Sequence, residues 1–136
     1  MRIGTQGSAG VVGSGVTRTF IAEINGVKTD LTGTAVVVDA NGQLGTMSSS
    51  RRYKQDIQPM AEASERLLKL RPFTFRYKQP NALGEKPIQY GLIAEEVAEV
   101  LPELVVLNKD GQPESVAYHL LPSLLLNELQ KEHRLN

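Results

Sequence analysis

The 136-residue sequence contains no cysteine and no tryptophan, and only 5% of its residues are aromatic. The lack of cysteine excludes disulfides and thiolate metal ligands, and the two histidines, His119 and His133, lie far apart in the sequence. Fifteen basic residues balance 15 acidic ones, whereas nucleic-acid-binding proteins usually show a basic excess. No apolar run approaches the roughly 20 residues of a membrane-spanning helix. We therefore expect no cofactor, no metal ion, and no nucleic-acid or membrane partner.

Glycine is concentrated in the first third of the sequence, where nine of the 12 glycines precede Ser48. Two β-prone runs, Thr19–Ile24 and Thr34–Asp39, are each followed by an Asn-Gly turn signal. Strands this short cannot bury a core alone, and they are expected to recruit neighbours through repetition or oligomerisation. We interpret residues 1–48 as the end of a Gly-rich β-stalk or fibre. A small β-meander packed on the rest of the chain is the alternative.

After residue 50 the sequence changes to patterns of short helices and hairpins. Apolar residues recur at spacings of three and four in the helices, and large and polar side chains alternate in the strands. Gly91 is interpreted as a point of close packing, and the acidic residues of the second helix as a solvated face. The predicted elements are a helix from Pro59 to Leu70, strands over Phe73–Tyr77 and Ile88–Tyr90, a helix over Leu92–Leu101, and a hairpin of Leu104–Leu107 with Glu114–Tyr118.

A last helix is expected to start at Pro122. Leu121, Leu125 and Leu129 recur at intervals of four residues, and Leu124 and Leu126 widen this apolar stripe. We interpret the stripe as the start of a three-helix coiled coil between copies of the chain. Periodicity alone fits a core helix of the monomer equally well.

A serine-rich stretch that ends at Ser50 is followed by Arg51, Arg52, Tyr53 and Lys54. A serine becomes a nucleophile where a neutral base accepts its proton. A lysine can be that base where desolvation and neighbouring cations make it give up its own proton. Ser49 and Lys54 are five residues apart, which suits neither a helix face nor one side of a strand, so a turn between them is required. The pattern alone also fits a polar loop with a solvated basic patch.

The run from Ser49 to Ile57 resembles the signature of the chaperone-peptidase family found at the C-termini of phage endosialidases, tailspikes and tail fibres. The same module is similar to the cleavage domain of the myelin regulatory factor. The family pattern is Ser, usually Asp, any residue, Arg, an apolar or aromatic residue, Lys, two variable positions and Ile. The resemblance continues to about residue 135, through Leu67–Pro72, Phe75–Tyr77, Tyr90–Val97 and Leu101–Val105, and Asp39–Thr46 resembles the segment that leads into the cut.

In that family the domain trimerises, guides folding of the fibre ahead of it and then releases itself. The resemblance therefore implies that Ser49 and Lys54 are the catalytic residues and that the chain is cut between Ser48 and Ser49. Arg52 matches the motif arginine and is expected to position the site. Ser50 stands where many members have aspartate, and we interpret it as keeping a hydrogen-bonding cap.

These observations predict an α+β homotrimer. Its parts are a β-stalk end over residues 1–48, an auto-processing chaperone domain over 49–120, and the start of a C-terminal coiled-coil helix over 121–136. The expected partners are copies of the same chain and the upstream fibre or spike. The expected setting is a virion tail-fibre or spike precursor made in the host cytoplasm, or a fibre-like bacterial surface protein.

Two alternatives remain open. The first is a non-cleaving trimerisation cap with the same fold and a silent site. The second is a nucleic-acid-binding module that uses Arg51, Arg52 and Lys54, which the balanced net charge disfavours.

Overall fold

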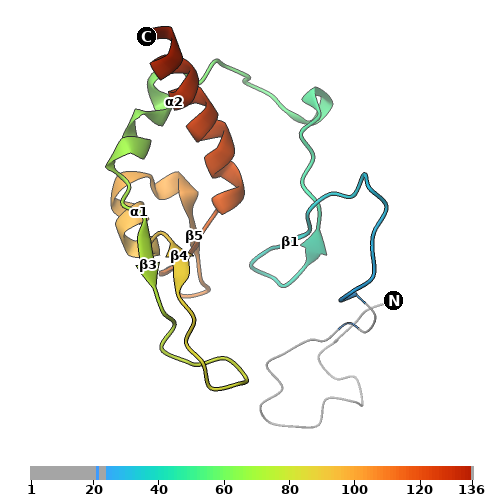
Figure 1. Cartoon of the computed structure of the whole chain (residues 1–136). Helices are drawn as coiled ribbons and strands as arrows, with labels where there is room; N and C mark the ends of the chain where they lie inside the picture. The colour runs from blue at the N-terminus through green and yellow to red at the C-terminus, as the bar shows by residue number, and fades with distance from the viewer. Residues whose placement is uncertain (1–20, 22–23, 136) are drawn as a thin grey trace. The chain divides into compact units, whose positions relative to one another are not determined.

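The structure is a computed structural model that describes residue 21 and residues 24–135 (Figure 1). The chain divides into two units, residues 1–36 and 37–136, and each is considered by itself. The β-prone run Thr19–Ile24 falls largely outside the described residues. In the described part of the first unit, Val27 N–H donates to the Ile24 carbonyl at 3.3 Å, and Gly26 has a φ of 86°. The Asn-Gly turn predicted there is therefore present.

A short hairpin opens the second unit. Strands β1 (Val37–Val38) and β2 (Leu44–Gly45) pair antiparallel, with Val37 opposite Gly45. The Asp39 carboxylate accepts from the N–H groups of Asn41 and Gln43 at 2.8 and 3.0 Å, which fixes the turn between the strands. This confirms the hairpin signal at Asn41-Gly42.

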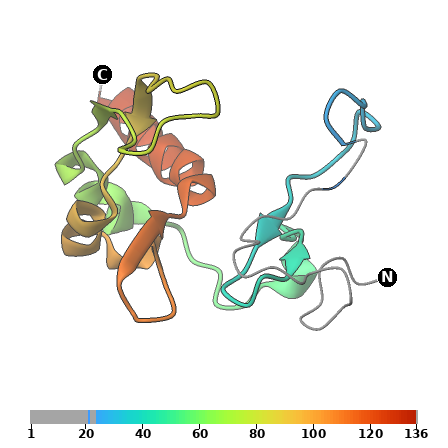
Figure 2. The same cartoon turned by 90° about the horizontal axis from the view of Figure 1, so that it is seen from below.

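The elements from residue 61 onward form the body of the second unit (Figures 1 and 2). Both of its strand pairs are antiparallel, as predicted. The elements are the 3-10 helix η2 (Ala61–Lys69), strands β3 (Phe73–Phe75) and β4 (Gln89–Gly91), helix α1 (Ala94–Val100), the 3-10 turn η3 (Pro102–Leu104), strands β5 (Val105–Leu107) and β6 (Pro113–Val116), the 3-10 turn η4 (Tyr118–Leu120) and helix α2 (Leu121–Leu135).

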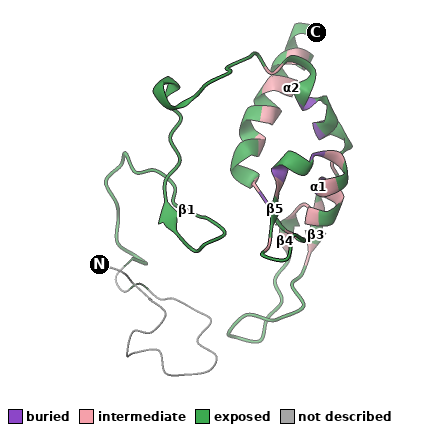
Figure 3. Cartoon of the chain, turned by 180° about the vertical axis from the view of Figure 1, so that it is seen from behind, coloured by how far each residue is buried: buried purple, intermediate pink, exposed green. Residues whose placement is uncertain are grey.

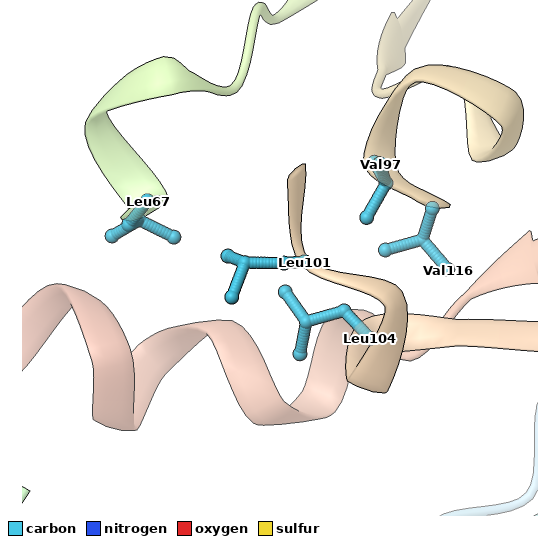
Figure 4. Packing of buried hydrophobic residues seen from close by; sticks show 5 residues of the cluster. All are labelled: Leu67, Val97, Leu101, Leu104 and Val116. Atoms are coloured by element: carbon cyan, nitrogen blue, oxygen red, sulfur yellow. The ribbon is translucent and has the colours of Figure 1, made fainter. Parts of the chain in front are cut away.

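A small aliphatic core holds the body together (Figure 4). Its buried members come from η2, from α1 and the turn after it, and from β6, and they are Leu67, Val97, Leu101, Leu104 and Val116. Leu121 and Leu124 of α2 pack against this cluster. Among the described residues, buried positions occur only in this body (Figure 3). The all-aliphatic core agrees with the scarcity of aromatic residues.

The first helix of the body differs from its prediction. It is a 3-10 helix that begins at Ala61, so Pro59 is not its first residue. Ala61 has a φ of 45°, in the left-handed region, and this breaks the helical path between Pro59 and the helix. The Asn127 side-chain amide donates to the Ala61 carbonyl at 2.9 Å and to the Ser64 hydroxyl at 2.6 Å. Contacts with α2 therefore hold the start of η2 in a form that the sequence pattern did not indicate.

Helix α2 lies beside η2 (Figures 1 and 2) and has two different faces. Leu121 and Leu124 are half-buried on the core, and Asn127 and Glu128 bond to η2. The other face carries the exposed leucines Leu125, Leu126 and Leu129, with exposed fractions of 55%, 54% and 66%. The helix thus acts as a core helix of the single chain while leaving a leucine face open. Leu121 does not belong to that open face, contrary to the predicted stripe.

Candidate autocleavage site

One 3-10 turn, η1 (Arg51–Tyr53), lies between the two predicted catalytic residues. Tyr53 N–H donates to the Ser50 carbonyl at 3.1 Å, and Lys54 N–H donates to the Arg51 carbonyl at 3.0 Å. A 3-10 turn rises only about 2 Å per residue, so it keeps the residues before and after it close together. This is the kind of turn that the five-residue spacing requires.

The turn brings Ser49 and Lys54 together. Lys54 Nζ lies 3.0 Å from Ser49 Oγ, at hydrogen-bonding distance, with the ammonium donating. Both side chains are exposed in the single chain, and η1 has no buried residue. Once the amine is neutral, the same pair of atoms can bond in the opposite sense, with the hydroxyl donating its proton to nitrogen. The geometry therefore suits proton transfer from serine to lysine.

Arg52 contacts its neighbour in the turn. Its guanidinium carbon lies 4.9 Å from the centroid of the Tyr53 ring, an arrangement typical of a cation–π contact. Within the part of the chain that the structure describes, no hydrogen bond joins Arg52 to Ser49 or Lys54. The contact that Arg52 makes in this turn is therefore with Tyr53 and not with the Ser49–Lys54 pair.

Ser50 does not act as the predicted hydrogen-bonding cap. It occupies the N-cap position of η1, but its side chain makes no capping bond. A serine cap would accept a hydrogen bond from Tyr53 N–H. In this short turn Tyr53 N–H already donates to the Ser50 carbonyl. The side chain that bonds to the backbone here is instead that of Ser48, whose hydroxyl accepts a hydrogen bond from Ser50 N–H at 3.2 Å. The sequence marks Ser48 only as the acyl side of the predicted cut, although a serine can also bond to the backbone amide two residues on, as in a serine turn.

Metal-binding clusters and membrane-spanning helices are not found among the described residues. Across residue 21 and residues 24–135 there is no group of three or more His, Asp or Glu side chains able to hold a metal ion. In the same residues no helix has the length and apolarity needed to cross a bilayer.

Glu96, on the acidic face of α1, pairs with Arg71 at 2.8 Å. That face therefore contributes a surface ion pair.

Comparison with known families adds a further observation about this segment. Residues 49–106 match the model of the peptidase family described as chaperone of endosialidase. This match supports an intramolecular chaperone domain in this part of the chain. The match begins at Ser49, the residue that the proposed cut would leave at a new N-terminus. No curated protein matches the chain.

The folded body extends beyond the matched part of the chaperone domain. Val106, where the match ends, lies in β5 and pairs with Ser115 of β6. Core residue Val116 and helix α2 also follow the match. The folded body therefore completes its hairpin and its core with residues C-terminal to the family match.

Proposed function

We propose that this chain is a self-cleaving intramolecular chaperone that assists folding of an upstream fibre or spike and then releases itself. The observation that carries the proposal is the 3.0 Å contact between Lys54 Nζ and Ser49 Oγ at the first residue of the chaperone match. The family supports the chaperone role, and the serine–lysine pair supplies a nucleophile and a base for the cut.

The proposed reaction runs within one chain. Neutral Lys54 takes the proton from Ser49 Oγ, and the oxygen attacks the carbonyl carbon of Ser48. The bond between that carbon and the Ser49 nitrogen then breaks, and the nitrogen receives the proton from Lys54. The product is an ester of Ser48 on the Ser49 hydroxyl, with a free Ser49 amine. Water hydrolyses the ester to a Ser48 carboxylate and restores the Ser49 hydroxyl.

The proposed working form is a homotrimer. An amine loses its proton more readily where water is excluded, yet both site residues are exposed in the single chain. The exposed leucine face of α2 offers a surface through which copies can associate. Association would couple shielding of the site to assembly, so that cutting follows folding. Loss of the chaperone would then leave the upstream segment, residues 1–48 and what precedes them, kinetically trapped in its folded form.

A non-cleaving trimerisation cap is the second candidate. The exposure of Ser49 and Lys54 favours it, because water around an amine favours the charged form, which cannot accept a proton. The cap and the self-cleaving chaperone share one fold and differ only in whether the chain is cut.

Intact mass of the expressed chain decides between the two. We expect fragments of residues 1–48 and 49–136, with Ser49 at the new N-terminus. Ser49→Ala should leave the chain whole, and Lys54→Arg should slow cutting by at least about a hundredfold, because arginine keeps its proton. Ser115→Ala and Lys109→Arg, at exposed positions of β6 and of the turn before it, are matched controls that should cut normally. A wild-type chain that stays whole would favour the cap, and a Ser49→Ala chain cut at the wild-type rate would exclude Ser49 as the nucleophile.

A further inference from the structure

The Ser48 side chain makes a bond across the proposed scissile peptide. Its hydroxyl accepts from the N–H of Ser50 at 3.2 Å, a residue i to i+2 contact of the kind that forms a serine turn. The ring that this contact closes contains both peptide bonds of Ser49, including the Ser48–Ser49 bond. It is therefore the contact that ties the acyl side of the cut to the segment carrying the nucleophile.

The attack requires two torsions of Ser49 to be set together. Oγ and the Ser48 carbonyl carbon are joined through Cβ, Cα and N of Ser49, so their separation depends on the side-chain torsion χ1 and the backbone torsion φ. The 3.0 Å contact with Lys54 restrains χ1. The hydrogen bonds of η1 restrain only the backbone from Ser50 onward. The Ser48 contact supplies the missing restraint on the backbone around Ser49.

We propose that the Ser48 hydroxyl is a positioning group for cleavage, which holds the Ser48–Ser49 peptide in the orientation that Ser49 Oγ attacks. This inference rests on the proposed function and adds a residue that the family motif, beginning at Ser49, does not include. Preorganisation of a reacting pair accelerates a reaction by removing torsional freedom before the barrier. Because the contact is a single exposed hydrogen bond between neutral groups, its effect is modest, about two- to tenfold in rate.

Substitution by threonine and valine provides the test. The two side chains have nearly the same shape, and only threonine keeps the hydroxyl. Cleavage of the full-length chain is followed by intact mass after synthesis at fixed concentration. Ser48→Thr should cut within about twofold of wild type, whereas Ser48→Val and Ser48→Ala should be slower by about two- to tenfold. Equal rates for the threonine and valine variants would overturn the proposal, because the side chain would then matter only through its size.

The pH profile separates positioning from a general loss of structure. Ser48 does not accept the proton, so its variants should lower the rate by the same factor at every pH and leave the shape of the profile unchanged. A changed shape would contradict a purely positioning role.

Hydrogen exchange in the Ser49→Ala chain tests the Ser48 contact without requiring cleavage. In that uncut background, Ser48→Val should speed hydrogen exchange at the Ser50 amide relative to Ser48→Thr, and unchanged exchange would show that the contact is not formed. If wild type cuts and Ser49→Ala does not, but all Ser48 variants cut like wild type, this inference fails while the proposed function stands. If wild type itself is never cut, both fail.

Discussion

At the scale of single residues, Gly91 has the tightest surroundings of the described glycines. A Cβ atom added there would lie 2.8 Å from Tyr118 Oη and 3.3 Å from Phe75 Cε1. Tyr118 Oη also accepts from Leu92 N–H at 2.9 Å, so the tyrosine ring is held over the glycine. The glycine thus lets η4 approach the end of β4, and it confirms the interpretation of Gly91 as a point of close packing.

Gly91→Ala should therefore destabilise the body by about 1–3 kcal/mol, because Tyr118 can move aside only by giving up its bond to Leu92. Thermal melting of the uncut Ser49→Ala chain measures the effect. Gly45→Ala is the matched control, since a Cβ at Gly45 meets nothing within 4 Å. In a Tyr118→Phe background, Gly91→Ala should destabilise the body less, because the oxygen that blocks the methyl group is gone. If the loss of stability is as large as before, the backbone or Phe75 and not the Tyr118 hydroxyl causes it.

The same scale shows where sequence reasoning about the site succeeded and where it failed. The spacing of Ser49 and Lys54 required a turn between them, and the structure contains that turn with the two side chains at 3.0 Å. The predicted cap at Ser50 was wrong, because a one-turn helix satisfies its own amide there. Cleavage chemistry itself stays a prediction. The hydrogen bond of Ser48 joins residues only two apart and produces no periodic pattern, so it was not predicted from the sequence.

At the scale of elements, a polar cluster fastens α2 to η2. The buried Ser64 hydroxyl donates to Glu128 Oε1 at 2.6 Å, and Lys131 Nζ lies 3.0 Å from the same carboxylate. Lys131 also pairs with Glu62 and Glu65 at 3.4 and 3.6 Å. The cluster satisfies the polar groups at this contact, where an unpaired buried hydroxyl would be costly.

The cluster makes the docking of α2 sensitive to acid. The Ser64 hydroxyl, followed by Lys131, holds the pKa of Glu128 below its ordinary value of 4.5. A lowered pKa means that the ionised carboxylate stabilises the fold above the ordinary value, and that this contribution is lost as pH falls through the lowered pKa. The Glu128→Gln variant should therefore melt at a lower temperature than the chain with Glu128 near neutral pH. This gap in melting temperature should close in acid.

Melting curves of the Ser49→Ala chain and its Glu128→Gln variant, from about pH 7 to about pH 3, measure that gap. Glu62 and Glu65 have pKa values shifted in opposite directions by their mutual contact, the first lowered and the second raised, and both are present in each chain. Glu132→Gln, at an exposed position of the same helix, is the control. A gap of constant size across the range would show that the Glu128 charge does not stabilise the contact.

The elements differ in how well the sequence predicted them. Both hairpins of the body and α1 follow from local patterns, because turn residues and apolar spacing act within a few positions of one another. The start of η2 at Ala61 is bonded to Asn127, 66 residues away along the chain. Tertiary contacts of this kind override local propensity, and no short-range pattern reports them.

At the scale of the whole molecule, the small core limits how stable a single chain can be. Five aliphatic residues form it, and many large apolar side chains remain exposed in the described part of the chain. The predicted coiled coil and the alternative of a core helix are compatible, because α2 packs one face on the core and leaves a different leucine face exposed. Sequence periodicity could not separate these faces, since it shows a wide apolar stripe without showing which part the protein's own core occupies. The homotrimer and the division of the chain at residue 48 stay predictions.

The exposed face of α2 allows the trimer to be tested without unfolding the protomer. Leu129 is 66% exposed in the single chain, so Leu129→Glu should leave the body folded and place like charges together in the trimer, where they would have to be desolvated. Light scattering should report a trimer for wild type and smaller species for the variant, with uncut chain accumulating in the variant. Gln130→Glu, an exposed change of the same charge on the same helix, should keep both the trimer and the cut.

Leu124→Glu, on the face of α2 that packs against the core, should instead unfold the body. Cleavage rate against protein concentration then separates assembly from folding, because a site completed by association cuts more slowly on dilution. Folded monomers that cut as fast as concentrated trimers would show that the single chain already holds the complete site.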